Sequence, residues 1–522
     1  MNWLKKLGKS ARRRRAKRTS RLARTRQCRF ENMEPRCLLS ASPIHVGLVY
    51  YEEASGFDER GDVFELTFSG GAEGTQLREL TIECDKLGDG LTIGDTFFDT
   101  EPTGNGAFNA VPLSVVSQSG IDAIAYDVED GGTTLTFRFE GFESGDRLVF
   151  SVDVDEMGFL GPNALAEGNE IEGSQLHATF AAPHYYEATG SDIFIDAFDA
   201  KLSQTGLALP NDDYVPPDAT PHPVRTAAAV FSLEQQPLPA SISGTVFVDP
   251  NLNVIQDAGE QPIAGVELTL LKYDGSGYVP TGKTTVTDEH GDYRFDNLLP
   301  GRYRVVETQP SGYLSVGAKA GQVNGATRGL VVDDDTIGDI DLQGGEDSRD
   351  NDFAEVLPAQ ISGHVYHDRD DDGMRDAGEE GIGGATITLT RLADVHLPQQ
   401  TYQVLTSADG SWAFSGLFPG RYEVREDQPA GYLDGKDAAG SEGGTAINPG
   451  DAIVDIALAS GAVGVNYDFG ELMPASISGH VLVDQDGDCR ADPGEKMLAG
   501  VTIELLDAQG KVVATTQTDD AG

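Results

Sequence analysis

Short segments in which apolar and polar residues alternate recur along the chain from residue 44 onward. Val63–Phe68, Leu135–Phe139 and Leu148–Val154 are alternating or continuously apolar over the length of a strand, and Gly, Asp and Glu fill the turns between them. Such segments are typical of β-strands, and no long stretch has the period of a helix. The pattern predicts one antiparallel β-sandwich over residues 44–236.

The second half of the chain is built from a repeated unit. The tripeptide Ile-Ser-Gly opens this unit at Ile242, Ile361 and Ile477, so the periods are 119 and 116 residues. Periods of this length correspond to whole domains rather than to the short units of a solenoid. We therefore expect modules at 238–357, 358–473 and 474–522.

Each module begins with a strand, passes through an acidic loop and continues into further strands. Alternation in the second module places Ile387 and Leu389 on the inward face and the neighbouring threonines on the outward face. Aromatic residues two positions apart share one face of a strand and are expected in the core: Tyr293 with Phe295, and Trp412 with Phe414. The fold class expected is all-β, with tandem β-sandwich modules after a separate N-terminal β-sandwich domain.

The third module stops at Gly522, which matches Gly291 and Gly410 of the first two modules. Half a sandwich would leave apolar strand edges unpaired, so we expect the chain to be a fragment or a truncated gene product. The linkers that precede the second and third modules are short and contain Pro358 and Pro474. Because proline restricts the backbone, successive modules are expected to form a semi-rigid rod.

Charge divides the chain into two parts. Residues 1–29 contain 13 Lys and Arg and no acidic residue, whereas the remainder carries 25 basic and 85 acidic residues. An acidic body argues against nucleic acid as its partner and favours a surface that collects cations. The basic head is expected to be a disordered tail, although nucleic acid, anionic lipid or a targeting role would also suit its charge. No apolar stretch is long enough for a transmembrane helix, and four scattered cysteines define no disulfide framework.

One acidic loop has the spacing of a calcium site. Counted from Asp368, oxygen-bearing side chains stand at the first, third, fifth, ninth and twelfth positions, and Gly373 stands at the sixth. A hard cation needs six or more oxygens on a tight curve, which this EF-hand-type spacing supplies. The alternative is a solvated acidic turn. The candidate ligands are Asp368, Asp370, Asp372, the carbonyl of Met374, Asp376 and Glu379.

The same spacing recurs in the other two modules, although the residues between the ligand positions differ. The first copy offers Asp249, Asn251, Asn253, the carbonyl of Ile255, Asp257 and Glu260. The third offers Asp484, Asp486, Asp488, the carbonyl of Arg490, Asp492 and Glu495. We expect the first loop to bind most weakly, because it has less charge and places Val254 where the tight-turn glycine belongs.

The ordered motifs of each module resemble the B domain of serine-aspartate-repeat (Sdr) surface proteins. The motifs are Ile-Ser-Gly, the acidic loop that ends in Gly-Glu, Pro300-Gly-Arg-Tyr303 or Pro419-Gly-Arg-Tyr422, a Pro-x-Gly-Tyr turn and a closing Asp-Phe-Gly/Ala-Glu. The resemblance covers residues 241–522. It implies a prealbumin-like (Cna-B-type) β-sandwich that binds Ca2+ and acts as a stiff stalk in cell-surface adhesins.

Related Cna-B modules carry an internal Lys-Asn isopeptide bond that a carboxylate assists. Glu307 and Glu426 stand in the kind of strand where that carboxylate occurs. The opening strands Ile242–Val248 and Ile361–His367, however, contain no lysine. Because the nucleophilic amine is missing from its usual place, we expect stabilisation by calcium rather than by an isopeptide crosslink.

The segment Glu31–Ala41 resembles the "LEPR-xLL" N-terminal motif of large extracellular proteins from planctomycete bacteria. It reads Glu-Asn-Met-Glu-Pro-Arg-Cys-Leu-Leu-Ser-Ala and follows the basic run, with Met33 at a position where the motif usually has Leu. The resemblance implies export, with removal of the tail near Ala41. Residues 1–43 are accordingly assigned as a basic tail with an export motif.

The N-terminal domain offers fewer candidate sites. Asp153, Asp155 and Glu156 follow a predicted strand and could bind a cation, and Tyr185-Tyr186 with His184 could stack on a sugar. A solvated strand end and an ordinary loop are the favoured explanation of these residues, because no complete ligand spacing is present.

Together these features predict a non-enzymatic extracellular or cell-surface protein, structural or adhesin-like, in which calcium-binding modules form a stalk. The partners expected are calcium ions and an extracellular protein or glycan. The alternative is a carbohydrate-binding accessory region of a larger secreted enzyme. The chain lacks a G-x-S-x-G nucleophile elbow and an H-E-x-x-H zinc motif, which argues against catalysis.

Overall fold

The computed structural model describes residues 41–51, 61–102, 110–157, 170–196 and 226–522. Every regular element in these ranges is a β-strand, as the alternating pattern predicts. The chain divides near Pro237 into two compact units. The basic head, most of the export motif and the proline-rich segment 214–223 lie outside the described residues. The first sheet begins at Ser42, inside the last residues of the predicted tail.

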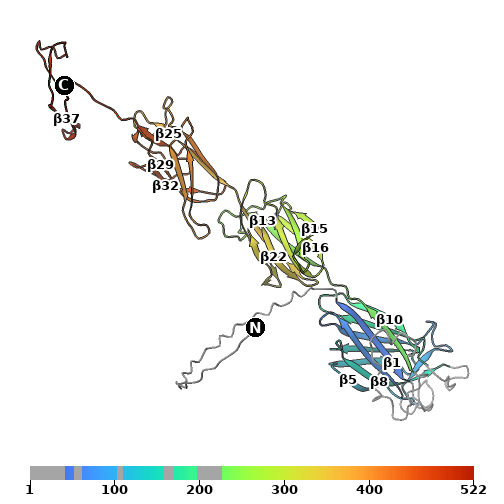
Figure 1. Ribbon diagram of the computed structural model, residues 1–522. Coiled ribbons are helices and arrows are strands. Elements are labelled where there is room, and N and C mark those ends of the chain that lie inside the picture. The colour runs from blue at the N-terminus through green and yellow to red at the C-terminus, as the bar shows by residue number, and fades with distance from the viewer. Residues whose placement is uncertain (1–40, 52–60, 103–109, 158–169, 197–225) are drawn as a thin grey trace, which may run out of the picture. The chain divides into compact units, whose positions relative to one another are not determined.

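The N-terminal unit is a sandwich of two antiparallel sheets (Figure 1). The first sheet contains, in order of pairing, β11 (Ile195–Asp196), β12 (Thr226–Leu233), β1 (Ser42–Tyr51), β2 (Asp62–Gly71), β8 (Arg147–Glu156) and β4 (Thr96–Asp99), and β5 (Ser114–Ser119) also pairs with β8. The second contains β10 (Ala188–Ile193), β9 (Gln175–Ala181), β3 (Gln76–Glu83), β7 (Thr134–Glu140) and β6 (Ala123–Val128).

Aromatic side chains from both sheets fill the centre of this sandwich. Phe64 on β2 stacks on Phe150 of β8 with ring centroids 4.7 Å apart. Phe137 reaches Phe150 from β7 of the opposite sheet at the same 4.7 Å separation. All three rings are fully buried, so the predicted strands around them do face one core.

The first repeat is a second sandwich, with its own core. One sheet has the order β16 (Asp292–Leu298), β13 (Ala240–Val248), β24 (Asp352–Val356) and β18 (Leu314–Lys319), and β23 (Asp347–Ser348) also pairs with β13. The other has the order β15 (Tyr278–Val286), β14 (Glu267–Tyr273), β17 (Gly301–Glu307), β22 (Thr336–Leu342) and β21 (Leu330–Asp333). A short hairpin, β19 (Gln322–Val323) with β20 (Ala326–Thr327), completes it.

The second repeat has the same topology. Its sheets have the orders β28 (Ser411–Leu417), β25 (Ala359–His367), β34 (Phe469–Leu472) and β30 (Leu433–Asp434), with β33 (Val463–Gly464) beside β25, and β27 (Gln400–Leu405), β26 (Thr386–Arg391), β29 (Gly420–Asp427), β32 (Ala452–Leu458) and β31 (Thr445–Ile447). The predicted aromatic pairs are buried in both repeats.

The first and last strands of each repeat lie side by side and run parallel. Val246 on β13 pairs with Phe353 on β24, and Val365 on β25 pairs with Phe469 on β34. The glycine of Ile-Ser-Gly is needed for this approach. A Cβ atom on Gly363 would lie 1.7 Å from the Tyr467 carbonyl oxygen, and one on Gly244 would lie 1.8 Å from that of Asn351.

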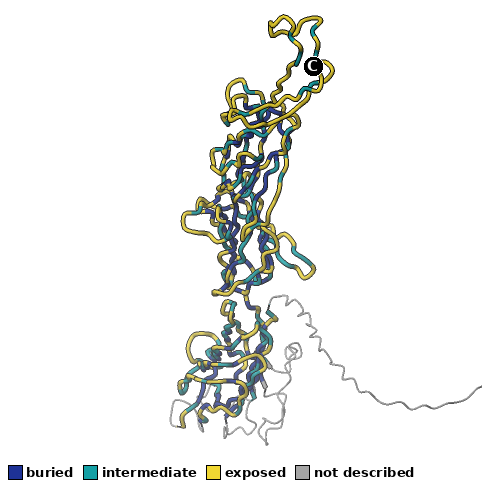
Figure 2. The backbone as a smooth tube through the Cα atoms, turned by 90° about the vertical axis from the view of Figure 1, so that its left-hand side faces the viewer, coloured by how far each residue is buried: buried dark blue, intermediate teal, exposed yellow. Residues whose placement is uncertain are grey.

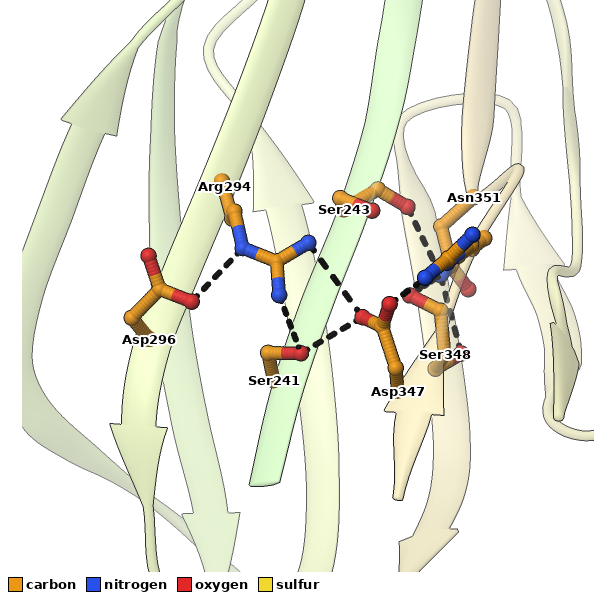
Figure 3. A network of polar contacts seen from close by, with 8 residues as sticks. Ser241, Ser243, Arg294, Asp296, Asp347, Ser348 and Asn351 are labelled. Carbon is orange, nitrogen blue, oxygen red and sulfur yellow. Dashed lines mark hydrogen bonds and ion pairs between the residues drawn. The ribbon is translucent and has the colours of Figure 1, made fainter. Parts of the chain in front are cut away.

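A polar network fastens these strands together in the first repeat (Figure 3). Arg294 on β16 donates to the Ser241 hydroxyl at 2.7 Å and forms ion pairs with Asp296 and Asp347 at 2.6 and 3.3 Å. Asn351 donates from its side-chain amide to the Ser243 carbonyl at 3.1 Å. The network therefore ties the opening strand to the segment that leads into the closing strand.

Residues 474–522 form two short two-stranded sheets. These are β35 (Leu482–Val483) with β36 (Lys496–Met497), and β37 (Thr502–Leu506) with β38 (Val512–Gln517). Ile477 is 81% exposed, whereas the equivalent Ile361 of the second repeat is fully buried. Exposed residues accordingly dominate this segment in Figure 2, in contrast to the buried interiors of the complete repeats.

Candidate metal centres

The three acidic loops share one backbone arrangement. The carboxylate at the first position accepts the N–H of the sixth residue, at 2.7 Å for Asp249 with Val254, 2.9 Å for Asp368 with Gly373 and 2.9 Å for Asp484 with Cys489. The sixth residue has a positive φ in each loop, at 59°, 80° and 65° respectively. Loops one and three therefore make the same tight turn without a glycine at that position.

The twelfth residue closes each loop in the same way. Glu260, Glu379 and Glu495 accept the N–H of the ninth residue at 2.8, 2.8 and 3.0 Å. The N–H of the seventh residue, whose carbonyl is the predicted ligand, donates to the fifth-position side chain in every loop. The donors are Ile255 at 2.7 Å, Met374 at 2.7 Å and Arg490 at 2.9 Å. Each loop thus draws its predicted ligands onto one tight curve.

Loop two concentrates the most carboxylate charge. Oxygens of Asp368, Asp370 and Glu379 lie within 4.8 Å of one another, and so do those of Asp370, Asp372 and Asp376. Desolvation, Asp372 and Asp368 together raise the pKa of Asp370. Like charges this close disfavour one another's ionised form, which is the condition a bound divalent cation would relieve.

Loop one differs, because amides occupy its third and fifth positions. The side-chain N–H2 groups of Asn251 and Asn253 each donate to the same oxygen of Asp257 at 2.9 Å. In loop three the positions are Asp486 and Asp488, as in loop two, but most of the loop is exposed. The three loops therefore share their backbone hydrogen bonds, with different side-chain chemistry in the first.

A second acidic cluster lies inside the first repeat, and the sequence did not predict it as a metal site. Glu307 on β17, Glu355 on β24 and Asp335 place carboxylate oxygens within 4.8 Å of one another. Glu307 is 4% exposed, and neither of its carboxylate oxygens has a hydrogen-bond partner among the described residues. Glu355 is fully buried and accepts hydrogen bonds from Gln309 and Ser315.

Burial and mutual repulsion shift the proton affinity of this cluster. Desolvation, Glu355 and Asp335 raise the pKa of Glu307 to about 9. Desolvation and the nearby Asp335 and Asp334 raise the pKa of Glu355 to about 7, against hydrogen bonds from Gln309 and Ser315. Carboxylates buried this way must hold protons or a cation, because an uncompensated buried charge is costly.

The second repeat has the same cluster with more carboxylates. Glu426 on β29 is buried against Glu471 on β34, and desolvation followed by Glu471 raises its pKa far above the usual range. Asp437 lies nearby, and desolvation, Asp434 and Asp451 raise its pKa to about 8. One signal in the sequence could have indicated this cluster. Every second residue of a strand faces the same side, so Glu426 faces inward with Tyr422 and Val424.

The acidic loop and the buried cluster are in direct contact within each repeat. The backbone N–H of Asp249 donates to the Glu355 carbonyl at 2.7 Å, and that of Asp368 donates to the Glu471 carbonyl at 2.9 Å. The first residue of the loop is thus held by the strand that carries a cluster glutamate.

The candidates of the N-terminal unit are arranged differently from the prediction. Carboxylate oxygens of Asp153 and Asp155 on β8 lie within 4.8 Å of one from Asp99 on β4, a partner that the sequence did not predict. Asp99 lies opposite Asp153 on the neighbouring strand, so their proximity depends on the register of β4 with β8. Tyr186 is 53% exposed, and Tyr185 forms a bridge to Pro237.

The chain is a β protein built of tandem sandwich modules. Each complete repeat combines a loop of calcium-type spacing with a buried carboxylate cluster, and both are candidate cation centres. The model of the SdrD B-like domain matches residues 240–354 and 359–471. These two repeats are SdrD B-like domains, as the motifs predict. No helix among the described residues is long and apolar enough to cross a membrane.

Relatives with similar sequences are serine-aspartate repeat-containing proteins. Protein D of Staphylococcus aureus (strain Newman) is 31% identical over 287 residues, which is 53% of this chain and 20% of that protein. Protein F of Staphylococcus epidermidis is 29% identical over 284 residues, 54% of this chain and 16% of that protein. The chain thus matches about a fifth or less of the length of these relatives.

Solved structures with some likeness include the Bacillus anthracis TIE protein. It has a TM-score of 0.21 and 12% identity, and the match covers 91% of this chain and 66% of that one. A double mutant of the shaft pilin SpaA from Lactobacillus rhamnosus GG has a TM-score of 0.18 and 12% identity, covering 46% and 99%. At these scores the likeness adds nothing to the fold described above.

Proposed function

We propose that this protein is an exported, non-enzymatic structural or adhesin-like protein of the cell surface, whose calcium-binding modules form a semi-rigid stalk. The observation that carries the proposal is the pairing, in each complete repeat, of an acidic loop with a buried carboxylate cluster. Two adjacent sets of carboxylates in a module of this size favour the binding of divalent cations. The relatives named above match this chain over 287 and 284 residues.

The candidate calcium ligands fall into two groups. The loops contribute the side chains and the seventh-position carbonyls given above, and loops two and three each have carboxylates at all five side-chain positions. Glu307, Asp335 and Glu355 form the inner group of the first repeat, and Glu426, Glu471 and Asp437 belong to that of the second. A bound cation would offset the repulsion within either group.

The strand arrangement suits a stalk. Because the first and last strands of a repeat are parallel neighbours, tension applied to the two ends of the module would shear their hydrogen bonds rather than peel them apart one at a time. The linker residue Leu357 is also bound to the repeat that follows it: its carbonyl accepts the N–H of Gly461 in the second repeat at 2.9 Å. Little free linker therefore remains to act as a hinge.

The size of the calcium effect can be bounded. An extracellular-type site with an affinity on the order of 0.1–1 mM would add about 1.4 kcal/mol at a tenfold excess of calcium. This is modest beside the roughly 5–15 kcal/mol of a whole domain. Calcium is therefore expected to stiffen the repeats and to raise their resistance to proteases rather than to decide whether they fold.

Replacing Asp368 and Glu379 with alanine tests the loop site. Calorimetric titration of the full chain with calcium should lose one binding event, because the first and twelfth ligands are removed together. Trp412, which is buried in the second repeat, should report the loss of about 1–2 kcal/mol of calcium stabilisation by its fluorescence during denaturation. The only other tryptophan, Trp3, is replaced by phenylalanine in all variants.

The control replaces Glu423 and Glu442 with alanine, which removes equal charge outside the loop and should preserve both the binding event and the calcium shift. If the parent protein binds no calcium and its melting does not respond to chelator, the loops are merely acidic turns and the calcium part of the proposal fails.

A further inference from the structure

The three loops place the same backbone hydrogen bonds around different side chains, and the difference lies at the third and fifth positions. We propose that the loop of the first repeat closes without a metal ion, because the side-chain amides of Asn251 and Asn253 donate to Asp257 where loop two would need a cation. The contrast with loop two rests on the calcium binding proposed above, whereas the closure of loop one does not.

The two loops differ in whether their side chains can hydrogen-bond to one another. In loop two, Asp370, Asp372 and Asp376 present only acceptors within 4.8 Å of one another, so no hydrogen bond can form among the ionised side chains. In loop one, two N–H2 groups meet one oxygen of Asp257 at 2.9 Å. Both bonds satisfy the charge of the Asp257 carboxylate within the loop.

The sixth residue of loop one also lies against a neighbouring strand of its repeat. Val254 has a φ of 59°, which is strongly unfavourable for a β-branched residue and persists only where the surroundings hold it. Its N–H is bound to Asp249 at 2.7 Å. Its methyl group faces Gly317 of β18, where an added Cβ would lie 3.3 Å away.

Loop two reverses this arrangement of large and small residues. Gly373 stands in the place of Val254 and faces Lys436, whose ammonium group donates to the carbonyl of Asp371. The apolar contact of loop one does not depend on ionic conditions, whereas the contact of loop two is between charged and polar groups. Removal of calcium should therefore loosen loop two and leave loop one closed.

Hydrogen exchange of the full chain in chelator, read by mass spectrometry, tests the closure of loop one. Peptides that cover 249–260 should be protected in the parent protein. They should exchange on the order of tenfold faster in Asn251→Asp with Asn253→Asp, which keeps every acceptor but removes both donors. The matched control is Asn297→Asp with Asn324→Asp, two exposed positions of the same repeat with positive φ, and it should leave these peptides unchanged.

Equal exchange of 249–260 in the parent and in the Asn251/Asn253 variant would overturn the proposal. Repeating the experiment with added calcium tests this proposal independently of the proposed function. In a Glu307→Gln background, which weakens the inner group of the same repeat, protection of 249–260 that rises on adding calcium also contradicts the proposal, whereas unchanged protection supports it. The peptides covering 368–379 report on loop two alone: if they do not respond, calcium binding there fails, and the chelator comparison still decides the closure of loop one.

Discussion

Replacing Glu426 with glutamine should stabilise the calcium-free second repeat at pH 8 and reduce the stabilisation that calcium brings. Glu426 is buried against Glu471, and its pKa is raised far above that of an unfolded glutamate. Folding at pH 8 must therefore either retain a proton that the unfolded chain has released or bury a charge. Glutamine removes that requirement, and the gain is expected on the order of 3 kcal/mol.

The pH dependence has a definite direction. Between the unfolded pKa near 4.5 and the raised pKa values of the folded cluster, the folded repeat binds more protons than the unfolded chain. The contribution of this cluster to the stability of the repeat should therefore be greatest below about pH 4.5. It should fall as the pH rises toward 8, by about 1.4 kcal/mol per pH unit for each proton that the folded repeat retains. Glu426→Gln should reduce this slope by the contribution of one proton, about 1.4 kcal/mol per pH unit.

Denaturation of the metal-free full chain at several pH values, followed by Trp412 fluorescence, measures both effects. Glu442→Gln provides the control, since Glu442 is exposed in the same repeat and should change neither the stability nor the slope. A variant that is less stable than its parent without calcium at pH 8 would contradict the assignment of Glu426 to a repulsive cluster.

The largest loss of stability is expected for Phe469→Ala. Phe469 is fully buried on β34 and pairs with Val365 on β25, so its ring packs where the first and last strands meet. Truncation of a buried phenylalanine costs about 3–5 kcal/mol, because the removed atoms lose their transfer free energy and leave a cavity. The loss should appear in both calcium and chelator, unlike that of any ligand substitution.

The same Trp412 signal measures this change. Val463→Ala is the matched control, because Val463 is 51% exposed on β33 of the same repeat and should alter stability by no more than about 0.5 kcal/mol. A loss of comparable size in the control, or none in Phe469→Ala, would show that the closing strand is not packed as described.

The sequence predicted those parts of the fold that depend on local periodicity. Alternation placed Ile387 and Leu389 on the inward face correctly, because successive side chains of a strand point to opposite faces. The acidic loops were equally accessible, since all of their ligands fall within twelve consecutive residues. Repetition of the ligand positions with variable intervening residues favours calcium sites over ordinary acidic turns, and this remains a prediction.

The inner clusters could not be predicted in the same way. Glu307 and Glu355 are far apart in sequence, and they meet only because β17 and β24 belong to facing sheets of one sandwich. Asp99 joins Asp153 through the register of β4 with β8, which no local pattern encodes. Alternation on β17 puts Glu307 on the inward face with Tyr303 and Val305, but the groups that it meets there depend on the tertiary structure.

The parallel pairing of first and last strands also bears on how such chains change in length. Each repeat begins and ends with equivalent strands, and the same Leu-Pro-Ala tripeptide precedes the first and second repeats at Leu238 and Leu357. A duplication or deletion of one period therefore joins a closing strand to an opening strand at an equivalent boundary. Recombination between repeats would yield a chain of whole modules, so their number can vary among descendants without any new sheet having to be formed.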